Sequence, residues 1–138
     1  MASLYAAIDG AAALPAPRQV LIVDDEPLVL DLVSRILEDH GFETRTAGNG
    51  EEAWRCLQQT HQPIDILITD LSMPKLGGRE LIDRVMKKSR PPWVVASSGE
   101  DDLLKALVEQ WGGRIYILAK PYGRRQLIEA IKASPRQP

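Results

Sequence analysis

The sequence predicts an α/β domain built on a doubly wound, five-stranded parallel sheet with the strand order 2-1-3-4-5. Two observations support this fold class. Short, continuous apolar runs rich in β-branched residues recur along the chain, as expected of parallel strands buried on both faces. Segments with the apolar spacing of amphipathic helices lie between these runs, and right-handed crossovers place such helices on both faces of a sheet.

Four of the predicted strands are apolar runs, which begin at Val20, Ile64, Trp93 and Ile115. The second strand of the five is different, because the segment Phe42 to Ala47 alternates apolar and polar residues. Such alternation is typical of an exposed edge strand. Placing this strand at an edge favours the order 2-1-3-4-5 and leaves the first and third strands adjacent.

Five helices are predicted between and after the strands. The first follows Pro27, which suits a first helical turn, and it closes at Gly41. Asn49 can cap the second helix. The apolar stripes of the five helices are, in chain order, Val29, Leu32, Val33, Ile36 and Leu37; Ala53, Cys56 and Leu57; Leu81, Ile82, Val85 and Met86; Leu103, Leu104, Leu107, Val108 and Trp111; and Leu127, Ile128 and Ile131.

Composition narrows the function classes. The length of 138 residues suits one domain, and 17 basic against 19 acidic residues give a net charge of -2, which argues against a polyanion-binding protein. The single cysteine, Cys56, excludes an internal disulfide and a multi-thiolate zinc site. No apolar run approaches the roughly 20 residues of a membrane helix. We therefore expect a cytoplasmic protein without membrane insertion.

The first 17 residues differ from the rest of the chain. They are rich in alanine, are interrupted by Asp9-Gly10 and end near Pro15 and Pro17. A secretory signal needs a basic start and an unbroken apolar core, which this segment lacks. We expect residues 1–17 to be a flexible leader or linker remnant, with a short helix packed on the domain as the alternative.

Polar residues follow four of the predicted strands. They are Asp24, Asp25 and Glu26 after the first, Asp70 after the third, Ser97 and Ser98 after the fourth, and Lys120-Pro121 after the fifth. Each alone has an ordinary structural interpretation, such as a turn or a helix start. Because the carboxyl ends of parallel strands meet at one edge, together they predict a binding site.

This set of residues suits phosphoryl transfer. Clustered carboxylates repel one another unless a cation joins them, and oxygen ligands with open positions suit Mg²⁺ beside phosphate oxygens. A carboxylate at such a site can attack phosphorus, while an ammonium and a hydroxyl stabilise the transferred group. The sequence has no Gly-rich nucleotide loop, so we expect a small phosphorylated group as donor rather than ATP.

The segments VLIVDDEP, LITDLSMPKLGGREL, VVASSGE and LAKPY resemble the receiver domain of two-component response regulators, including its chemotaxis-regulator-like members. The resemblance spans residues 18–134 and leaves 135–138 as a tail. Each motif alone is weak, but four in this order and spacing are specific. The resemblance implies a flavodoxin-like fold and the function of a phosphorylation-controlled switch. Such a protein is not an enzyme acting on other substrates, because it catalyses only its own phosphorylation and dephosphorylation.

The resemblance also implies a metal site and a phosphoacceptor. Asp70 corresponds to the acceptor, and Asp25 to a direct ligand of Mg²⁺ or Mn²⁺. Asp24 would bind the ion through water or by hydrogen bonding. The backbone carbonyl of Ser72 would complete the protein ligands.

Residues after the last two strands correspond to groups that contact the phosphoryl group. Ser98 would donate a hydrogen bond to it, and Lys120 would pair with its charge. Pro121 is expected to follow a cis peptide bond. Met73-Pro74 and Gly78 would shape the loop after the acceptor.

The sequence departs from the family at one position. Receiver domains often carry an aromatic residue three positions before the lysine, where this chain has Ile117. Tyr116 is one position away and is expected to face the other side of the sheet. The sequence therefore does not predict whether this chain signals through rotation of an aromatic ring. Ser72 and Glu100 follow the acceptor and Ser98 by two residues, and we expect them to influence dephosphorylation.

The expected phosphodonor is a histidine kinase or a histidine phosphotransfer protein. The expected output is control of a protein target through the face of the fourth helix, fifth strand and fifth helix. We expect no direct contact with nucleic acid. The protein is expected to be a monomer or a phosphorylation-dependent dimer. One alternative is an Asp-nucleophile phosphohydrolase, although these enzymes usually carry a second Asp where Ser72 lies. Others are a phosphorylation-independent interaction module and the receiver of a hybrid kinase.

Overall fold

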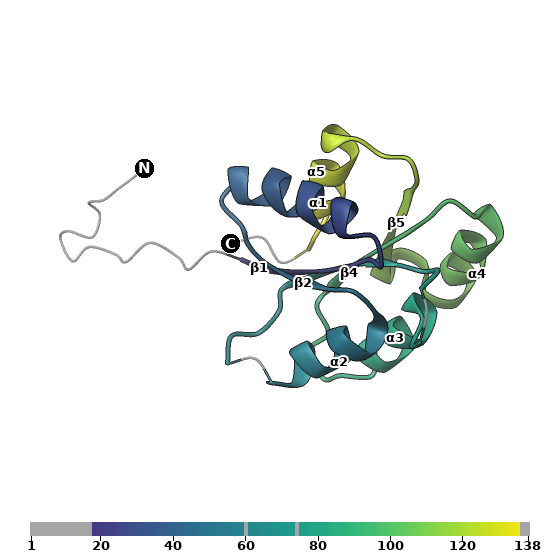
Figure 1. Cartoon of the computed structure of the whole chain (residues 1–138). Helices are drawn as coiled ribbons and strands as arrows, with labels where there is room; N and C mark the ends of the chain where they lie inside the picture. The colour runs from purple at the N-terminus through teal and green to yellow at the C-terminus, as the bar shows by residue number, and fades with distance from the viewer. Residues whose placement is uncertain (1–17, 60, 74, 136–138) are drawn as a thin grey trace.

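The computed structural model describes residues 18–59, 61–73 and 75–135, which form a parallel sheet covered on both faces by helices (Figure 1). The strands are β1 (Gln19–Val23), β2 (Glu43–Ala47), β3 (Ile66–Asp70), β4 (Trp93–Ser98) and β5 (Ile115–Ala119). Their order is β2-β1-β3-β4-β5, which confirms the predicted topology. Every strand pair is parallel.

The helices divide between the two faces of the sheet. They are α1 (Pro27–Asp39), α2 (Gly50–Gln59), α3 (Gly78–Val85), α4 (Asp101–Trp111) and α5 (Arg124–Lys132), with a short 3-10 turn, η2 (Gly112–Arg114), after α4. Helices α1 and α5 cover one face, and α2, α3 and α4 cover the other (Figure 1). In the described part of the chain, none of the helices has the length and hydrophobicity needed to cross a bilayer.

The core consists of two apolar layers, one on each face of the sheet. Alternate strand residues enter opposite layers, as Leu21 and Ile22 of β1 do. Residues 64–71 and 93–98 are almost wholly buried because both layers cover them. The edge strand β2 exposes most of its side chains, as its alternating sequence predicts. This double burial is why β1, β3 and β4 contain continuous apolar runs, whereas β5, at the other edge of the sheet, is only partly buried.

Most local predictions agree with the structure. The side chain of Asn49 caps α2, because its Oδ1 atom accepts a hydrogen bond of 2.9 Å from the backbone N–H of Glu52. Tyr116 and Ile117 pack against opposite layers, as expected. Cys56 is half-buried against the layer formed by α2, α3 and α4.

Two residues of the predicted helical stripes are exposed. Leu32 of α1 is 60% exposed and Val108 of α4 is 49% exposed. Periodicity identifies the apolar side of a helix, but the sheet contacts only part of that side. In α1 this part consists of Val33, Ile36 and Leu37. The expected leader at 1–17, Pro74 and the end of the expected tail at 136–138 lie outside the described residues.

Candidate functional site

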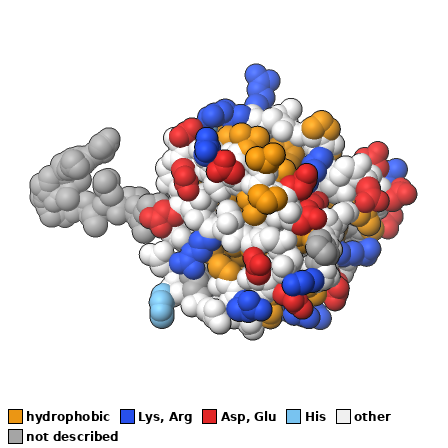
Figure 2. All heavy atoms as spheres, viewed as in Figure 1, with side chains coloured by type: hydrophobic (Ala, Val, Ile, Leu, Met, Phe, Trp, Pro, Cys, Tyr) orange, Lys and Arg blue, Asp and Glu red, His pale blue; other side chains and the backbone are white. Residues whose placement is uncertain are grey.

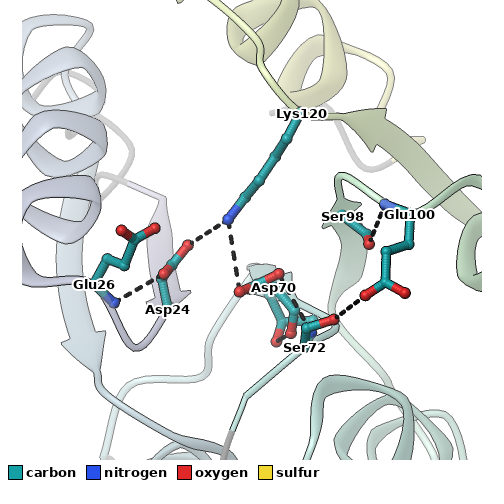
Figure 3. A network of polar contacts seen from close by, with 8 residues as sticks. Asp24, Glu26, Asp70, Ser72, Ser98, Glu100 and Lys120 are labelled. Atoms are coloured by element: carbon teal, nitrogen blue, oxygen red, sulfur yellow. Dashed lines mark hydrogen bonds and ion pairs between the residues drawn. The ribbon is translucent and has the colours of Figure 1, made fainter.

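The parallel pairing aligns the strand ends that carry the polar residues. Asp70, the last residue of β3, lies opposite Ser97 of β4, and Ser98 lies opposite Ala119 of β5. Lys120 comes directly after β5, and its backbone N–H donates a hydrogen bond of 3.0 Å to the carbonyl oxygen of Ser98. The predicted residues therefore meet at one edge of the sheet (Figure 3).

Three carboxylates form the acidic part of this edge. Oxygen atoms of Asp24, Asp25 and Asp70 all lie within 4.8 Å of one another. Asp24 and Asp70 are only 3% and 7% exposed, whereas Asp25 is exposed to solvent. A backbone N–H also reaches this group, because Glu26 donates a hydrogen bond of 3.0 Å to Oδ1 of Asp24.

The Lys120 ammonium lies above two of the carboxylates (Figure 3). Its Nζ atom is 3.1 Å from Oδ2 of Asp24 and 3.6 Å from Oδ2 of Asp70. The peptide bond between Lys120 and Pro121 is cis, as the resemblance predicted. The lysine thus supplies positive charge to an otherwise acidic site.

Burial and charge act against each other on these groups. Burial raises the pKa of the Asp70 carboxyl, and the nearby charges of Asp24 and Asp25 add to this effect, which Lys120 only partly offsets. Burial lowers the pKa of Lys120, but the hydrogen bond to Asp24 and the charge of Asp70 outweigh it and leave the pKa raised. Without a further cation, the protein therefore opposes ionisation of Asp70.

A chain of hydrogen bonds runs along the other side of Asp70. The backbone N–H of Ser72 points to Oδ1 of Asp70 at 3.4 Å, and the Ser72 hydroxyl donates to Oε2 of Glu100 at 3.1 Å. The backbone N–H of Glu100 in turn donates to Oγ of Ser98 at 2.9 Å. Because Ser98 accepts this bond, which Figure 3 shows, its own hydroxyl hydrogen stays available for donation to another group.

The loop after Asp70 is held close to the strand that it leaves. The backbone N–H of Gly78 donates a hydrogen bond of 3.3 Å to the carbonyl oxygen of Leu71. A Cβ atom at Gly78 would overlap the carbonyl oxygen of Asp70 and would lie 2.7 Å from Cα of Leu71. Only glycine therefore lets α3 begin this close to the end of β3.

Two features of the site were not predicted. The first is the direct hydrogen bond between Ser72 and Glu100, although both positions had been singled out by their spacing. The second is the position of Tyr122, where burial raises the pKa of the phenol and the charges of Lys120, Asp24 and Asp70 are close enough to act on it. Tyr122 follows the Lys-Pro motif by one residue, a position to which the sequence alone attaches no chemistry.

Comparison with known proteins finds one family. The model of the response regulator receiver domain matches residues 20–132. The transcriptional regulatory protein CpxR homolog of Haemophilus influenzae is 34% identical over 119 residues, which cover 86% of this chain and 51% of that protein. The response regulator GtcR of Aneurinibacillus migulanus is 32% identical, with 87% of this chain and 48% of that protein covered. The chain thus spans about half the length of these curated relatives.

Solved structures show the same fold. A response regulator receiver domain protein from Clostridium thermocellum superposes with a TM-score of 0.75 at 31% identity, covering 85% of this chain and 93% of the other. The chemotaxis protein CheY4 of Vibrio cholerae also gives a TM-score of 0.75, at 27% identity, covering 86% of this chain and 99% of the other.

Proposed function

Because the chain belongs to the family of response regulator receiver domains, which are signalling switches rather than conventional enzymes, we propose that it is controlled by phosphorylation of Asp70. One observation carries the proposal. Asp24 and Asp25 at the end of β1 and Lys120 at the end of β5 meet around the nearly buried carboxylate of Asp70 at the end of β3. This arrangement supplies an acceptor, a place for a divalent cation and a counter-charge for phosphate oxygens.

The proposed reaction is transfer from a phosphohistidine of a histidine kinase or phosphotransfer protein. An oxygen of the Asp70 carboxylate forms a bond to phosphorus while the phosphorus–nitrogen bond breaks, and the imidazole nitrogen keeps the electron pair. Lys120 and the Ser98 hydroxyl then contact the oxygens of the transferred group. Positioning and charge stabilisation account for the acceleration, and the chain provides both.

The acidic cluster fits Mg²⁺ or Mn²⁺ as the resident cation. Asp25 would bind it directly, Asp24 through water or by hydrogen bonding, and Asp70 and the Ser72 carbonyl would complete the protein ligands. The oxygen-only donor set and the exposed position of Asp25 suit an ion that keeps several waters. When bound, the cation supplies positive charge that offsets the negative charge developing on the phosphoryl oxygens.

Phosphorylation would change the balance of charge at this edge. The modification adds roughly -1.5 to -2 units of charge beside Lys120 and Ser98. Ser98 connects through Glu100 to the start of α4, so its movement toward the phosphoryl group would displace that helix. We propose that the face formed by α4, β5 and α5 changes as a result and controls a partner protein in the cytoplasm.

Labelling with a small phosphodonor tests the assignment. Incubation with acetyl phosphate and Mg²⁺ is expected to add one phosphoryl group by intact-mass measurement, and treatment with base is expected to remove it. Asp70→Asn should abolish the gain. Asp31→Asn is the matched control, because Asp31 is an exposed carboxylate of α1 that pairs with Arg35 at 3.2 Å. Labelling of the Asp70→Asn protein at another residue would overturn the proposal.

The same sample separates the alternatives. Repeated turnover of simple phosphate esters would identify a phosphohydrolase, although Ser72 stands where such enzymes place a second aspartate. Failure to bind Mg²⁺ and to accept phosphate would identify an interaction module. Retention of the acidic pair and of Lys120 in one cluster supports the phosphoreceiver.

A further inference from the structure

The strand β2 forms one edge of the sheet, and part of its backbone points away from its neighbour (Figure 1). In a parallel ladder, every second residue directs both its N–H and its C=O toward the same neighbouring strand. The N–H of Glu43 donates a hydrogen bond of 3.0 Å to the carbonyl oxygen of Arg18, so every second residue from Glu43 onward faces β1. The backbone groups of Thr44 and Thr46 therefore point outward.

The side chains of this edge carry opposite charges at neighbouring positions on one face. Glu43 and Arg45 are two residues apart, so they project on the same side of the sheet, and both are exposed. The carboxylate of Glu43 accepts a hydrogen bond of 2.6 Å from Nε2 of Gln19. Arg45 forms no ion pair with any residue that the structure describes. It borders a hollow of about 420 Å³ between β2 and α2, which leaves its guanidinium room to reorient.

These two charges make β2 complementary to a second copy of itself in one register. If two β2 strands pair antiparallel about a twofold axis at Thr44, the two Thr44 residues exchange both backbone hydrogen bonds, and each Glu43 lies opposite an Arg45. Opposite charges across an antiparallel pair attract, whereas like charges repel. An axis at Arg45 would place two arginines opposite each other, and an axis at Thr46 would place Arg45 opposite Ala47. The charges therefore favour the axis at Thr44.

The other face of the strand suits the same register. Phe42 directly precedes β2 and is half-buried against the layer formed by α1 and α5. With the axis at Thr44, Phe42 of one copy lies opposite Thr46 of the other. Aromatic and β-branched side chains stabilise each other when they face across two strands. Both faces of β2 would thus gain favourable cross-strand pairs.

The strand lacks the features that usually protect a sheet edge. Proteins protect such edges with proline, bulges or charges that repel a second strand. The sequence of β2, ETRTA, contains no proline, and its pairing with β1 is regular over all five residues. The net charge of -2 is small, and Figure 2 shows basic and acidic side chains interspersed on the face that it displays. No strong field of one sign therefore opposes the approach of a second copy.

We propose that β2 is a dimerisation edge, at which two copies of this chain pair their β2 strands antiparallel about Thr44 and form one continuous sheet. This edge is opposite β5, so the contact leaves the face of α4, β5 and α5 free. The contact does not include Asp70, so the inference does not depend on the proposed function. Because one short strand per copy forms the contact, we expect a weak dimer, with a Kd on the order of 100 μM.

Charge reversal tests the register. Glu43→Lys and Arg45→Glu each place like charges opposite each other in both cross-strand pairs. Each should raise the Kd by about tenfold or more in sedimentation velocity between about 10 μM and about 1 mM protein. An equimolar mixture of the two variants restores both attractive pairs, and so does the double variant Glu43→Lys, Arg45→Glu. Both samples are expected to associate as the wild type does, and circular dichroism checks that each variant is folded.

Arg55→Glu is the matched control. Arg55 is an exposed arginine that borders the same hollow as Arg45, but it lies on α2 and outside the strand pairing. Its reversal changes the net charge as much as Arg45→Glu does and should leave the Kd unchanged. A wild type that stays monomeric at about 1 mM would overturn the proposal. So would a dimer that neither strand reversal weakens, or an equal loss with Arg55→Glu, because net charge would then explain the effect.

Cysteine crosslinking tests the position of the twofold axis. With Cys56→Ala as background, Thr44→Cys would place two Cα atoms about 5.5 Å apart across a hydrogen-bonded pair, which suits a disulfide. Diamide, which takes up the two electrons and two protons, should convert this variant to a covalent dimer. Thr46→Cys should stay monomeric, because its two copies lie on opposite sides of the axis. Efficient crosslinking of Thr46→Cys without that of Thr44→Cys would overturn the proposed register.

Acetyl phosphate distinguishes this contact from one controlled by phosphorylation. The Kd of the β2 dimer should be the same with and without acetyl phosphate and Mg²⁺, and Asp70→Asn should not change it. A dimer that forms only after addition of acetyl phosphate and survives both strand reversals would place the contact on another face and overturn the proposal. Failure of Asp70 to accept phosphate would instead contradict the proposed function and leave the expected β2 dimer intact.

Discussion

The Nζ atom of Lys120 lies 3.1 Å from Oδ2 of Asp24, although 96 positions separate the two residues in the chain. The same ammonium is 3.6 Å from Oδ2 of Asp70. One lysine therefore offsets two nearly buried carboxylates, while Asp25 adds further negative charge at the rim. The site is short of positive charge, and this imbalance has measurable consequences for stability and for cation binding.

Removal of the lysine charge should destabilise the domain. For Lys120→Met we expect the free energy of unfolding to fall by about 2 kcal/mol at neutral pH, because two buried carboxylates lose their counter-charge. The partial exposure of the lysine keeps the loss below that of a fully buried pair. Urea unfolding in Mg²⁺-free buffer measures the change. Lys120→Arg retains the charge and should recover most of the stability; equal losses in both variants would show that shape rather than charge matters.

Removal of the Asp70 charge should have the opposite effect. Burial raises the pKa of the Asp70 carboxyl in the folded protein despite the opposing charge of Lys120. A carboxyl with a raised folded-state pKa reduces stability above that pKa and does not reduce it below the unfolded-state pKa. Asp70→Asn should therefore raise the free energy of unfolding at neutral pH, by on the order of 1 kcal/mol.

The gain should disappear as the pH falls through the pKa of Asp70, because the wild-type carboxyl is then neutral as well. Unfolding by urea at a series of pH values, without divalent cations, follows this dependence. A stabilisation that stays constant into the acidic range would point to packing rather than to charge and would contradict the electrostatic explanation.

Mg²⁺ should stabilise the wild-type domain through the acidic cluster. A ligand that binds only the folded state adds about 2.7 kcal/mol at a hundred times its Kd, so the Tm should rise with the concentration of MgCl₂. Asp25→Asn should remove most of this rise. Asp25 is exposed, so the Tm without Mg²⁺ should change little.

Asp31→Asn serves as the control for this titration, with NaCl at matched ionic strength to separate specific binding from screening. Asp31 lies on the exposed side of α1 and belongs to an ion pair with Arg35. A Tm rise that survives Asp25→Asn but is lost with Asp31→Asn would place the cation elsewhere.

The fold could be predicted because its signals are local. Runs such as Ile66–Ile68 in β3 are apolar throughout, since both faces of each central strand are covered. The polar residues of Glu43–Ala47 correctly predicted that this strand lies at an edge of the sheet. The carboxyl ends of the parallel strands lie at one edge of the sheet, and this determines which polar residues meet. The sequence alone therefore predicts that Asp24, Asp70 and Lys120 lie together.

Other features depend on distances that no local pattern contains. The periodicity of α1 placed Leu32 in the buried stripe, but only the packing of α1 on the sheet shows where that contact ends. The hydrogen bond between Ser72 and Glu100 joins two loops that are 28 positions apart, so it depends on the side-chain conformations at the mouth of the site. A groove beside Tyr122 likewise exists only once the loop after β5 lies against α1.

The close contact of Gly78 with the end of β3 makes the acceptor loop sensitive to a single methyl group. For Gly78→Ala we expect a loss of unfolding free energy of about 2 kcal/mol, because the added Cβ overlaps the backbone of Asp70 and Leu71, which cannot move aside without disturbing the strand. The displaced strand end would also slow labelling of Asp70 by acetyl phosphate. Urea unfolding and intact-mass time courses measure the two effects.

Gly113→Ala is the control, because a Cβ at Gly113 would meet no heavy atom within 4 Å. This substitution should change neither stability nor labelling by more than a small amount, since surface changes of this size usually stay within about 0.5 kcal/mol. If Gly78→Ala were as stable as Gly113→Ala and labelled as fast, the start of α3 would have room to move away from β3. The loop would then not hold Asp70 in place, and its position would depend on Lys120 and the neighbouring carboxylates instead.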